Sequence, residues 1–163
     1  MKAKNFRKMD SMPYTRRGYI GGGIPQSRIT KFTMGNPSGD FESKVELVSL
    51  ERAHISHNAL EAARIAANRV LESSFGRDAF SLKIIPYPHD VIRHHKRVAV
   101  AQADRYQEGM KRAYGKPFGT AARIEPGAQL IVIGVNKSGV DTAKEALKRA
   151  SAKFPITTKI VAQ

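Results

Sequence analysis

The stretch that decides the fold is residues 58–74, NALEAARIAANRVLESS. Its apolar residues recur three and four positions apart, which predicts one buried helix face made of Leu60, Ala63, Ala67, Val70 and Leu71. Asn58 is the expected N-cap, with Glu61 in the capping-box position, and Gly76 is the expected left-handed cap. Such an amphipathic helix needs a partner element to cover its apolar face.

Segments on both sides of this helix predict that partner. Apolar residues in strand-like runs predict six strands, at residues 44–50, 80–84, from 91, 120–124, 129–135 and 157–162, and residues 28–33 could add a short one. A second helix is predicted over 140–153, and a turn at 125–128 predicts a hairpin of the strands beside it. Two helices and about six strands predict an α+β fold, with both helices on one face of a mostly antiparallel or mixed sheet.

Composition narrows the class of protein. The 163 residues include 28 Lys and Arg against 14 Asp and Glu, a formal charge of +14. Such an excess repels itself unless it meets counter-charge, and nucleic-acid phosphate is the usual source. No cysteine is present, so no disulfide or thiolate metal site is expected. The absence of a signal-like or membrane-spanning apolar run predicts an intracellular, cytoplasmic protein without a membrane partner.

The charge is unevenly distributed along the chain. Residues 1–34 carry +7 and residues 91–123 carry +6, whereas residues 35–90 between them carry −2. Charge that served solubility alone would not divide in this way. We therefore predict two polyanion-binding blocks.

The first block contains a predicted extended arm, residues 1–27, because Gly21, Gly22, Gly23 and Pro25 prevent a helix there. Arg16 and Arg17 belong to this arm, which we expect to order only against another surface. Residues 28–163 are predicted to form a single α+β domain with an internal basic loop at 94–117.

The second block centres on residues 93–117, RHHKRVAVAQADRYQEGMKRAYGKP, with seven Lys or Arg and two acids. A loop this long inside a compact domain is usually functional or disordered. Residues 98–112 could instead form an amphipathic helix, and either shape presents cations. Arginines pair with phosphates, and the interleaved histidines and tyrosines can stack on unpaired bases.

Motifs of other chemistry are weak. Gly109 and Gly115-Lys116 have the wrong spacing for a phosphate-binding loop, and Pro117 stands where that motif needs Ser or Thr. His54 and His57 have metal-like spacing but no third ligand nearby, so a solvated or capping role is expected for them. No cofactor, metal site or catalytic residue is predicted.

Several segments resemble a known family: GGGIPQSRI, ALEAARIAANR, GRDAFSLKIIPYPHDVIR, ADRYQEGMKRAYGKPFGTAARI, KEALKRASAKFP and TKIVAQ. In this order they resemble the universal large-subunit ribosomal protein L-sixteen family, in its archaeal and eukaryotic L-ten-e branch. The chain departs from that pattern at His94-His95 and lacks the longer C-terminal tail of eukaryotic members after Gln163. Contacts of that tail are therefore not transferred.

The resemblance implies an α/β-hammerhead-like fold and a place in the cytoplasmic large ribosomal subunit. It implies binding to large-subunit ribosomal RNA near the A-site tRNA, beside neighbouring ribosomal proteins. The loop matching residues 96–115 is implied to reach toward the peptidyl-transferase region. The implied role is structural, in subunit assembly and tRNA positioning, rather than catalytic.

Candidate RNA-binding residues are the cations and histidines of the two basic blocks. They are Arg16, Arg17, Arg28, Lys31, Arg93, His94, His95, Lys96, Arg97, Arg105, Lys111, Arg112, Lys116 and Arg123. Two other classes of protein share this charge pattern: a free-standing RNA-binding regulator and an enzyme acting on RNA. The enzyme is disfavoured because the basic blocks hold only three acids, Asp10, Asp104 and Glu108.

Overall fold

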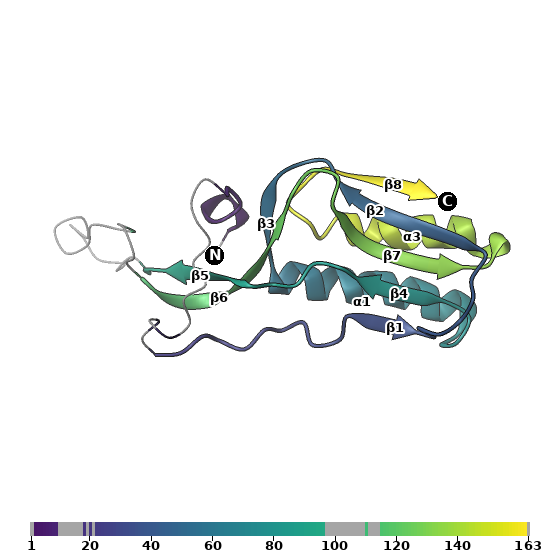
Figure 1. Ribbon diagram of the computed structural model, residues 1–163, viewed down its shortest axis with the longest axis horizontal. Coiled ribbons are helices and arrows are strands. Elements are labelled where there is room, and N and C mark those ends of the chain that lie inside the picture. Colours follow the sequence, from purple (N-terminus) through teal and green to yellow (C-terminus); the bar gives the residue numbers. More distant parts are fainter. Residues whose placement is uncertain are drawn as a thin grey trace.

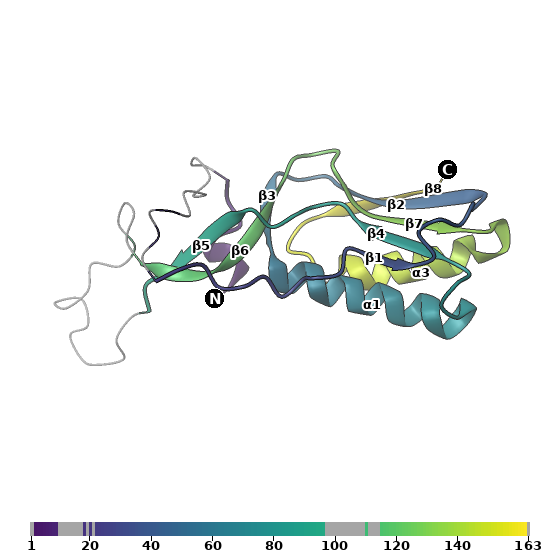
Figure 2. The same cartoon turned by 60° about the horizontal axis from the view of Figure 1, so that its bottom comes forward.

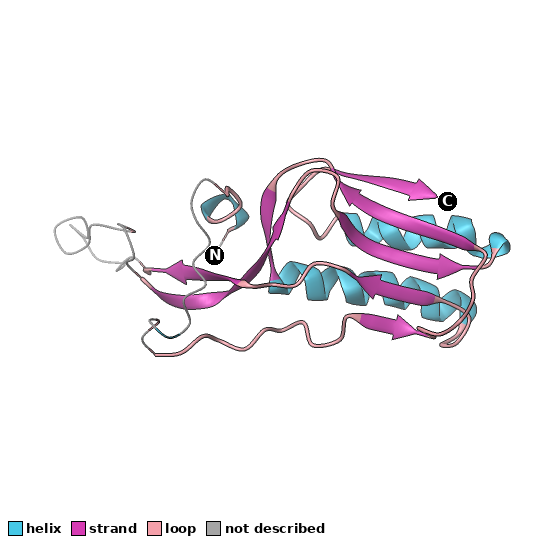
Figure 3. Cartoon of the chain, in the orientation of Figure 1, coloured by secondary structure: helices cyan, strands magenta, loops and turns pink. Residues whose placement is uncertain are grey.

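The structure is a computed structural model that describes residues 2–9, 18, 20, 22–96, 110 and 115–162. Within these ranges, two α-helices and eight strands make up two antiparallel sheets (Figures 1 and 3). Two short 3-10 helices, Ala3–Asn5 and Lys137–Gly139, complete the described elements. The predicted α+β class, with two helices and antiparallel sheets, is confirmed.

The larger sheet has five strands in the order β1-β4-β7-β2-β8. Their bounds are Thr33–Gly35 (β1), Ser81–Ile84 (β4), Gln129–Val135 (β7), Ser43–Ser49 (β2) and Thr158–Ala162 (β8). The most apolar strand, β7, lies at the centre, because it pairs with β2 on one side and β4 on the other. A central strand has no edge exposed to solvent, which suits its continuous apolar sequence.

Both helices cover one face of this sheet (Figures 1 and 2). α1 (His57–Phe75) and α3 (Val140–Ser151) lie side by side, and their apolar stripes share one core with the sheet. All five residues predicted for the buried face of α1 are buried. Leu147 and Ala150 of α3 close the same core.

The ends of α1 differ in part from the prediction. The N-cap is Ser56, whose Oγ accepts a hydrogen bond from the Ala59 backbone N–H at 3.4 Å. The observed N-cap thus lies two residues before the predicted cap, Asn58. Glu61 pairs with Arg64 instead of closing a capping box. Gly76 does follow the helix with a positive φ of 78°, although its ψ of −168° is extended rather than left-handed helical.

A smaller sheet projects beyond the helices (Figure 1). It contains β3 (Ala53–Ser56), β6 (Lys116–Ile124) and β5 (Asp90–His94) in that order. β3 runs directly into α1, so the projecting sheet is attached to the body by a continuous backbone. After β5 the structure describes the chain up to Lys96, and directly before β6 it describes Gly115.

The predicted hairpin of residues 120–124 with 129–135 is wrong, because β6 and β7 belong to different sheets. The turn itself is present: the Ala128 N–H donates to the Glu125 carbonyl, and Gly127 has a φ of 82°. However, Ser49 at the end of β2 exchanges backbone hydrogen bonds with Gly127 and Ala128. These bonds fix the turn on the larger sheet and leave β6 to pair with β3 and β5.

Two shorter elements also differ from the prediction. Residues 28–32 do not form a strand, and β1 begins only at Thr33. The Arg28 N–H donates to the His57 side chain rather than to a neighbouring strand. β3 was missed because it has only four residues, AHIS, whose alternation is too short to stand out.

Candidate nucleic-acid interface

The end of the β5–β6 pair gathers five of the predicted RNA-binding residues. Cross-strand register places Arg93 opposite Pro117 and His94 opposite Lys116, and His95 and Lys96 follow directly after β5. Antiparallel pairing brings residues distant in sequence to the same end of a sheet. Arg93, His94, His95, Lys96 and Lys116 are therefore neighbours at the tip of the projecting sheet, the hairpin end.

An irregularity in this pairing exposes an aromatic ring. The register shifts between Ile92 and Arg93, so that Phe118 has no partner on β5. Such a bulge turns a side chain away from its regular position. Phe118 is 45% exposed, and its ring meets the His94 ring edge-on with 5.6 Å between centroids. Sequence reasoning missed Phe118, and the only sequence signal was its place between Pro117 and Gly119.

The described residues of the hairpin end are basic. Residues 93–96 and 115–119 contain Arg93, Lys96 and Lys116, and no Asp or Glu occurs among these nine residues. Like charges on one surface create a positive potential that attracts polyanions. This part of the described chain is therefore suited to phosphate.

Arg123 has a different environment from the hairpin end. Its Nη1 lies 3.6 Å from Oδ2 of Asp90, a residue that is only 5% exposed. The same Oδ2 lies 2.7 Å from Nε2 of His54. Two basic side chains thus converge on one buried carboxylate. Because His54, Asp90 and Arg123 belong to β3, β5 and β6, this contact links all three strands of the smaller sheet.

His54 also fixes the N-terminal segment. Its Nδ1 lies 3.1 Å from the Phe6 carbonyl oxygen, and its backbone N–H donates to the Arg7 carbonyl. The Arg7 guanidinium pairs with Glu51 just before β3. The described residues 2–9 are therefore held against the smaller sheet, and the expected solvated role of His54 is wrong.

His57 fixes the extended segment that directly follows the predicted arm. It is buried at the first position of α1, and its Nδ1 accepts a hydrogen bond from the Arg28 N–H at 3.1 Å. Burial first, and then the Arg28 charge, lowers the pKa of His57 below its usual value. The lowered pKa favours the neutral ring, and Nδ1 of a neutral ring can accept the Arg28 N–H. Because His57 is buried and bonded to Arg28, the expected solvated or capping role is wrong for this residue too.

Arg28 and Lys31 lie on an extended segment, not at the hairpin end. Both side chains are exposed, while Ile29 between them is buried in the core. Lys31 borders a hollow that also includes Asn68 and Glu72 of α1. The structure therefore separates the predicted cations into two groups on different elements.

Six predicted residues lie outside the described residues: Arg16, Arg17, Arg97, Arg105, Lys111 and Arg112. The alternative helix at 98–112 lies almost entirely outside them too. Among the residues that are described, no three His, Asp or Glu side chains group as a metal site would require. None of the described helices combines the length and apolar character needed to cross a membrane.

The geometry defines a small basic α+β protein with a projecting sheet that carries several cations at its tip. The family described as "Ribosomal protein L16p/L10e" matches residues 1–161, and this chain belongs to that family. The resemblance noted in the sequence is thereby confirmed.

Relatives from three archaea share this similarity, each named "Large ribosomal subunit protein uL16". The protein of Staphylothermus marinus is 50% identical over 159 residues, 98% of this chain and 91% of that protein. The protein of Hyperthermus butylicus is 48% identical over 91% of this chain and 82% of its own length. The protein of Sulfolobus acidocaldarius is 48% identical over 95% of this chain and 89% of its own length.

Proposed function

We propose that this protein is a structural component of the large ribosomal subunit and that its hairpin end binds the subunit's ribosomal RNA. The observation that carries the proposal is the convergence of Arg93, Lys96 and Lys116 on one end of the smaller sheet. Family membership and relatives named as large-subunit proteins support the same role.

Electrostatics explains why this tip suits RNA. Each cation that neutralises a phosphate releases condensed counterions, so several such contacts supply most of the affinity. His94 and the exposed Phe118 add flat rings beside the cations, and such rings stack on unpaired bases. The proposed contact is therefore with phosphates and splayed bases rather than with a regular duplex groove.

The finer placement follows the family resemblance. We infer that the hairpin end directs the loop matching residues 96–115 toward the A-site tRNA and the peptidyl-transferase region of a cytoplasmic ribosome. The structure supports this direction because β5 and β6 lead into the loop from the basic tip. Neighbouring ribosomal proteins are further proposed partners, and the proposed role in assembly and tRNA positioning requires no cofactor or catalysis.

Co-sedimentation tests this function against the alternative of a free-standing regulator. A tagged copy replaces the resident protein in an archaeal host, and large subunits are washed in high salt and separated on a gradient. We expect about one tagged copy per large subunit. A tagged protein that stays at the top of the gradient after the wash would indicate a regulator and overturn the proposal.

The Arg93→Ala variant examines the hairpin end in the same assay. We expect fewer mature large subunits or slower tRNA accommodation, because one phosphate contact is lost at the loop base. The melting temperature of the isolated protein should be unchanged. Lys159→Ala, which removes an exposed cation from the edge strand β8, is the matched control and should assemble normally. A matching fall in melting temperature would assign Arg93 to the fold instead.

A further inference from the structure

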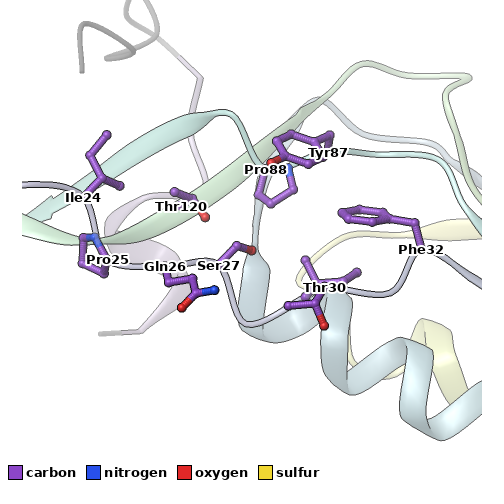
Figure 4. A pocket seen from close by; sticks show the side chains of 10 residues that line it. Ile24, Pro25, Gln26, Ser27, Thr30, Phe32, Tyr87, Pro88 and Thr120 are labelled. Atoms are coloured by element: carbon purple, nitrogen blue, oxygen red, sulfur yellow. The ribbon is translucent and has the colours of Figure 1, made fainter. Parts of the chain in front are cut away.

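A pocket of about 440 Å³ lies between the extended arm segment and the smaller sheet (Figure 4). Ser27 and Phe32 of the extended segment 22–32 line it, together with Tyr87 and Pro88 before β5 and Thr120 of β6. Ligand pockets for small organic groups have volumes in this range. The pocket is separate from the residues of the hairpin end described above.

Aromatic rings form one wall of the pocket. Phe32 and Tyr87 stack with centroids 5.4 Å apart and an interplanar angle of 24°. His89 extends the row, with its ring centroid 4.5 Å from that of Tyr87. Tyr87 is nevertheless 50% exposed. A row of rings that is packed together yet open to solvent is a ready surface for another flat ring.

Two hydroxyl groups of the pocket lining have no partner. The oxygens Oγ of Ser27 and Oγ1 of Thr120 are buried and make no hydrogen bond within the described part of the chain. Thr120 is only 3% exposed. A buried hydroxyl without a partner costs free energy, and a ligand that supplies a donor or acceptor removes that cost. The occupant should therefore have a polar edge as well as a flat face.

The charged residues near the pocket narrow the chemical class of the ligand. Arg28 is exposed and directly follows Ser27 of the lining, and none of the ten residues lining the pocket is acidic. The nearest acid in sequence, Asp90, is occupied by His54 and Arg123. A cation adjacent in sequence to the lining, without an acid in the lining itself, favours a ligand that carries phosphate.

We propose that this pocket takes one unpaired base of an RNA strand, with a phosphate of that strand at Arg28. The base packs against Tyr87 and Phe32, and its polar edge bonds to the hydroxyls of Thr120 and Ser27. Single-strand binders combine a basic track with aromatic platforms in this way. The inference rests on the proposed function, because it adds a second RNA contact to the hairpin end.

Binding of the full chain to two labelled RNA probes tests the inference. One probe is a single strand of about twelve nucleotides, within the usual range of single-strand sites, and the other is the same strand annealed to its complement. We expect Tyr87→Leu to weaken single-strand binding about tenfold and duplex binding less than about twofold, because only the unpaired base needs the ring. Tyr87→Phe should keep the wild-type affinity for both probes.

Further variants separate the elements of the pocket. Thr120→Val keeps the side-chain shape but removes the hydroxyl, and we expect about a threefold loss for the single strand alone, within the range of a lost hydrogen bond. Ile85→Ala, an exposed apolar change outside the pocket lining, is the control and should alter neither affinity. Melting temperatures of all variants establish that each one folds.

An unchanged single-strand affinity in Tyr87→Leu would overturn the base pocket, as would an equal loss for both probes. Unchanged binding by Thr120→Val would overturn the part of the inference that concerns the hydroxyls. These results leave co-sedimentation with large subunits unaffected. Loss of co-sedimentation in the wild type would overturn the proposed function itself, so the two failures are distinguishable.

Discussion

The three-stranded sheet of this protein buries a carboxylate, whereas the five-stranded sheet buries none among its described residues. Behind the five-stranded sheet, the helices enclose a continuous apolar core that includes Leu71, Ile131 and Leu147. The three-stranded sheet contributes to this core too, but it also buries Asp90, with His54 and Arg123 directed at its carboxylate. It also carries the basic hairpin end.

This difference explains how one small chain can be stable although it carries a large positive charge. The apolar core contributes most of the stability, because burial of apolar area is the main favourable term in folding. The smaller sheet adds Ile55, Ala122 and Ile124 to this core. Polar contacts at Asp90 and at Glu51 further hold its strands and the N-terminal segment. The core thus allows the tip to stay basic although like charges destabilise a compact state.

The largest expected effect lies in the apolar core. Leu71→Ala should lower the free energy of unfolding by about 2–5 kcal/mol, because it leaves a cavity under α1. Ile65→Ala changes an exposed residue of the same helix and should cost less than about 0.5 kcal/mol. Urea denaturation measures both. Equal losses would mean that the sheet and the helices do not share the tight core described above.

The next effect concerns the buried carboxylate of the smaller sheet. Asp90→Asn should cost about 1.5–3 kcal/mol, because His54 and Arg123 lose the charge that both approach. Amide exchange should increase first in β3 and β5, while the protection of α1 is largely kept. Asp78→Asn alters an exposed acid and should leave stability unchanged. Uniform loss of protection across both sheets would remove the distinction between the two regions.

A smaller effect is expected from pH. Burial lowers the pKa of His57 below its usual value of 6.5, so below that pH the unfolded chain binds a proton that the folded chain rejects. Stability should therefore fall as the pH decreases through 6.5 toward the lower folded pKa, and protonation also removes the acceptor for the Arg28 N–H. His57→Asn should reduce this slope.

Melting temperatures between pH 7.5 and 5 measure that slope. His89→Asn changes an exposed histidine and should keep the wild-type slope. If His57→Asn and the wild type showed the same dependence, the contact between His57 and the arm would not titrate as described.

The sequence predicted the core well, because long periodic segments report burial directly. The five apolar residues of α1 and the central strand β7 follow from spacing alone. The division into two sheets could not be predicted, because it depends on Ser49 bonding to the turn at Gly127 and Ala128. No local pattern encodes a contact between residues so far apart.

The charged residues of the candidate site could be predicted from the sequence, but their spatial arrangement could not. Charge blocks identified Arg93, Lys96 and Lys116, whereas the exposure of Phe118 depends on a register shift. The paired roles of His54 and His57 were missed because their partners, Asp90 and Arg28, lie far away in sequence. Tyr87 and Thr120 meet in one pocket only because the arm lies over the sheet. The division into an arm at 1–27 and a domain at 28–163 stays a prediction.

The most direct test of the central claim is the salt dependence of binding to large-subunit ribosomal RNA. For the wild type, the logarithm of affinity should fall steeply and linearly with the logarithm of salt concentration. The Lys96→Gln/Lys116→Gln variant should have a slope shallower by about two, with an unchanged melting temperature. A flat dependence in the wild type, or an identical slope in the variant, would contradict the assignment of RNA binding to the hairpin end.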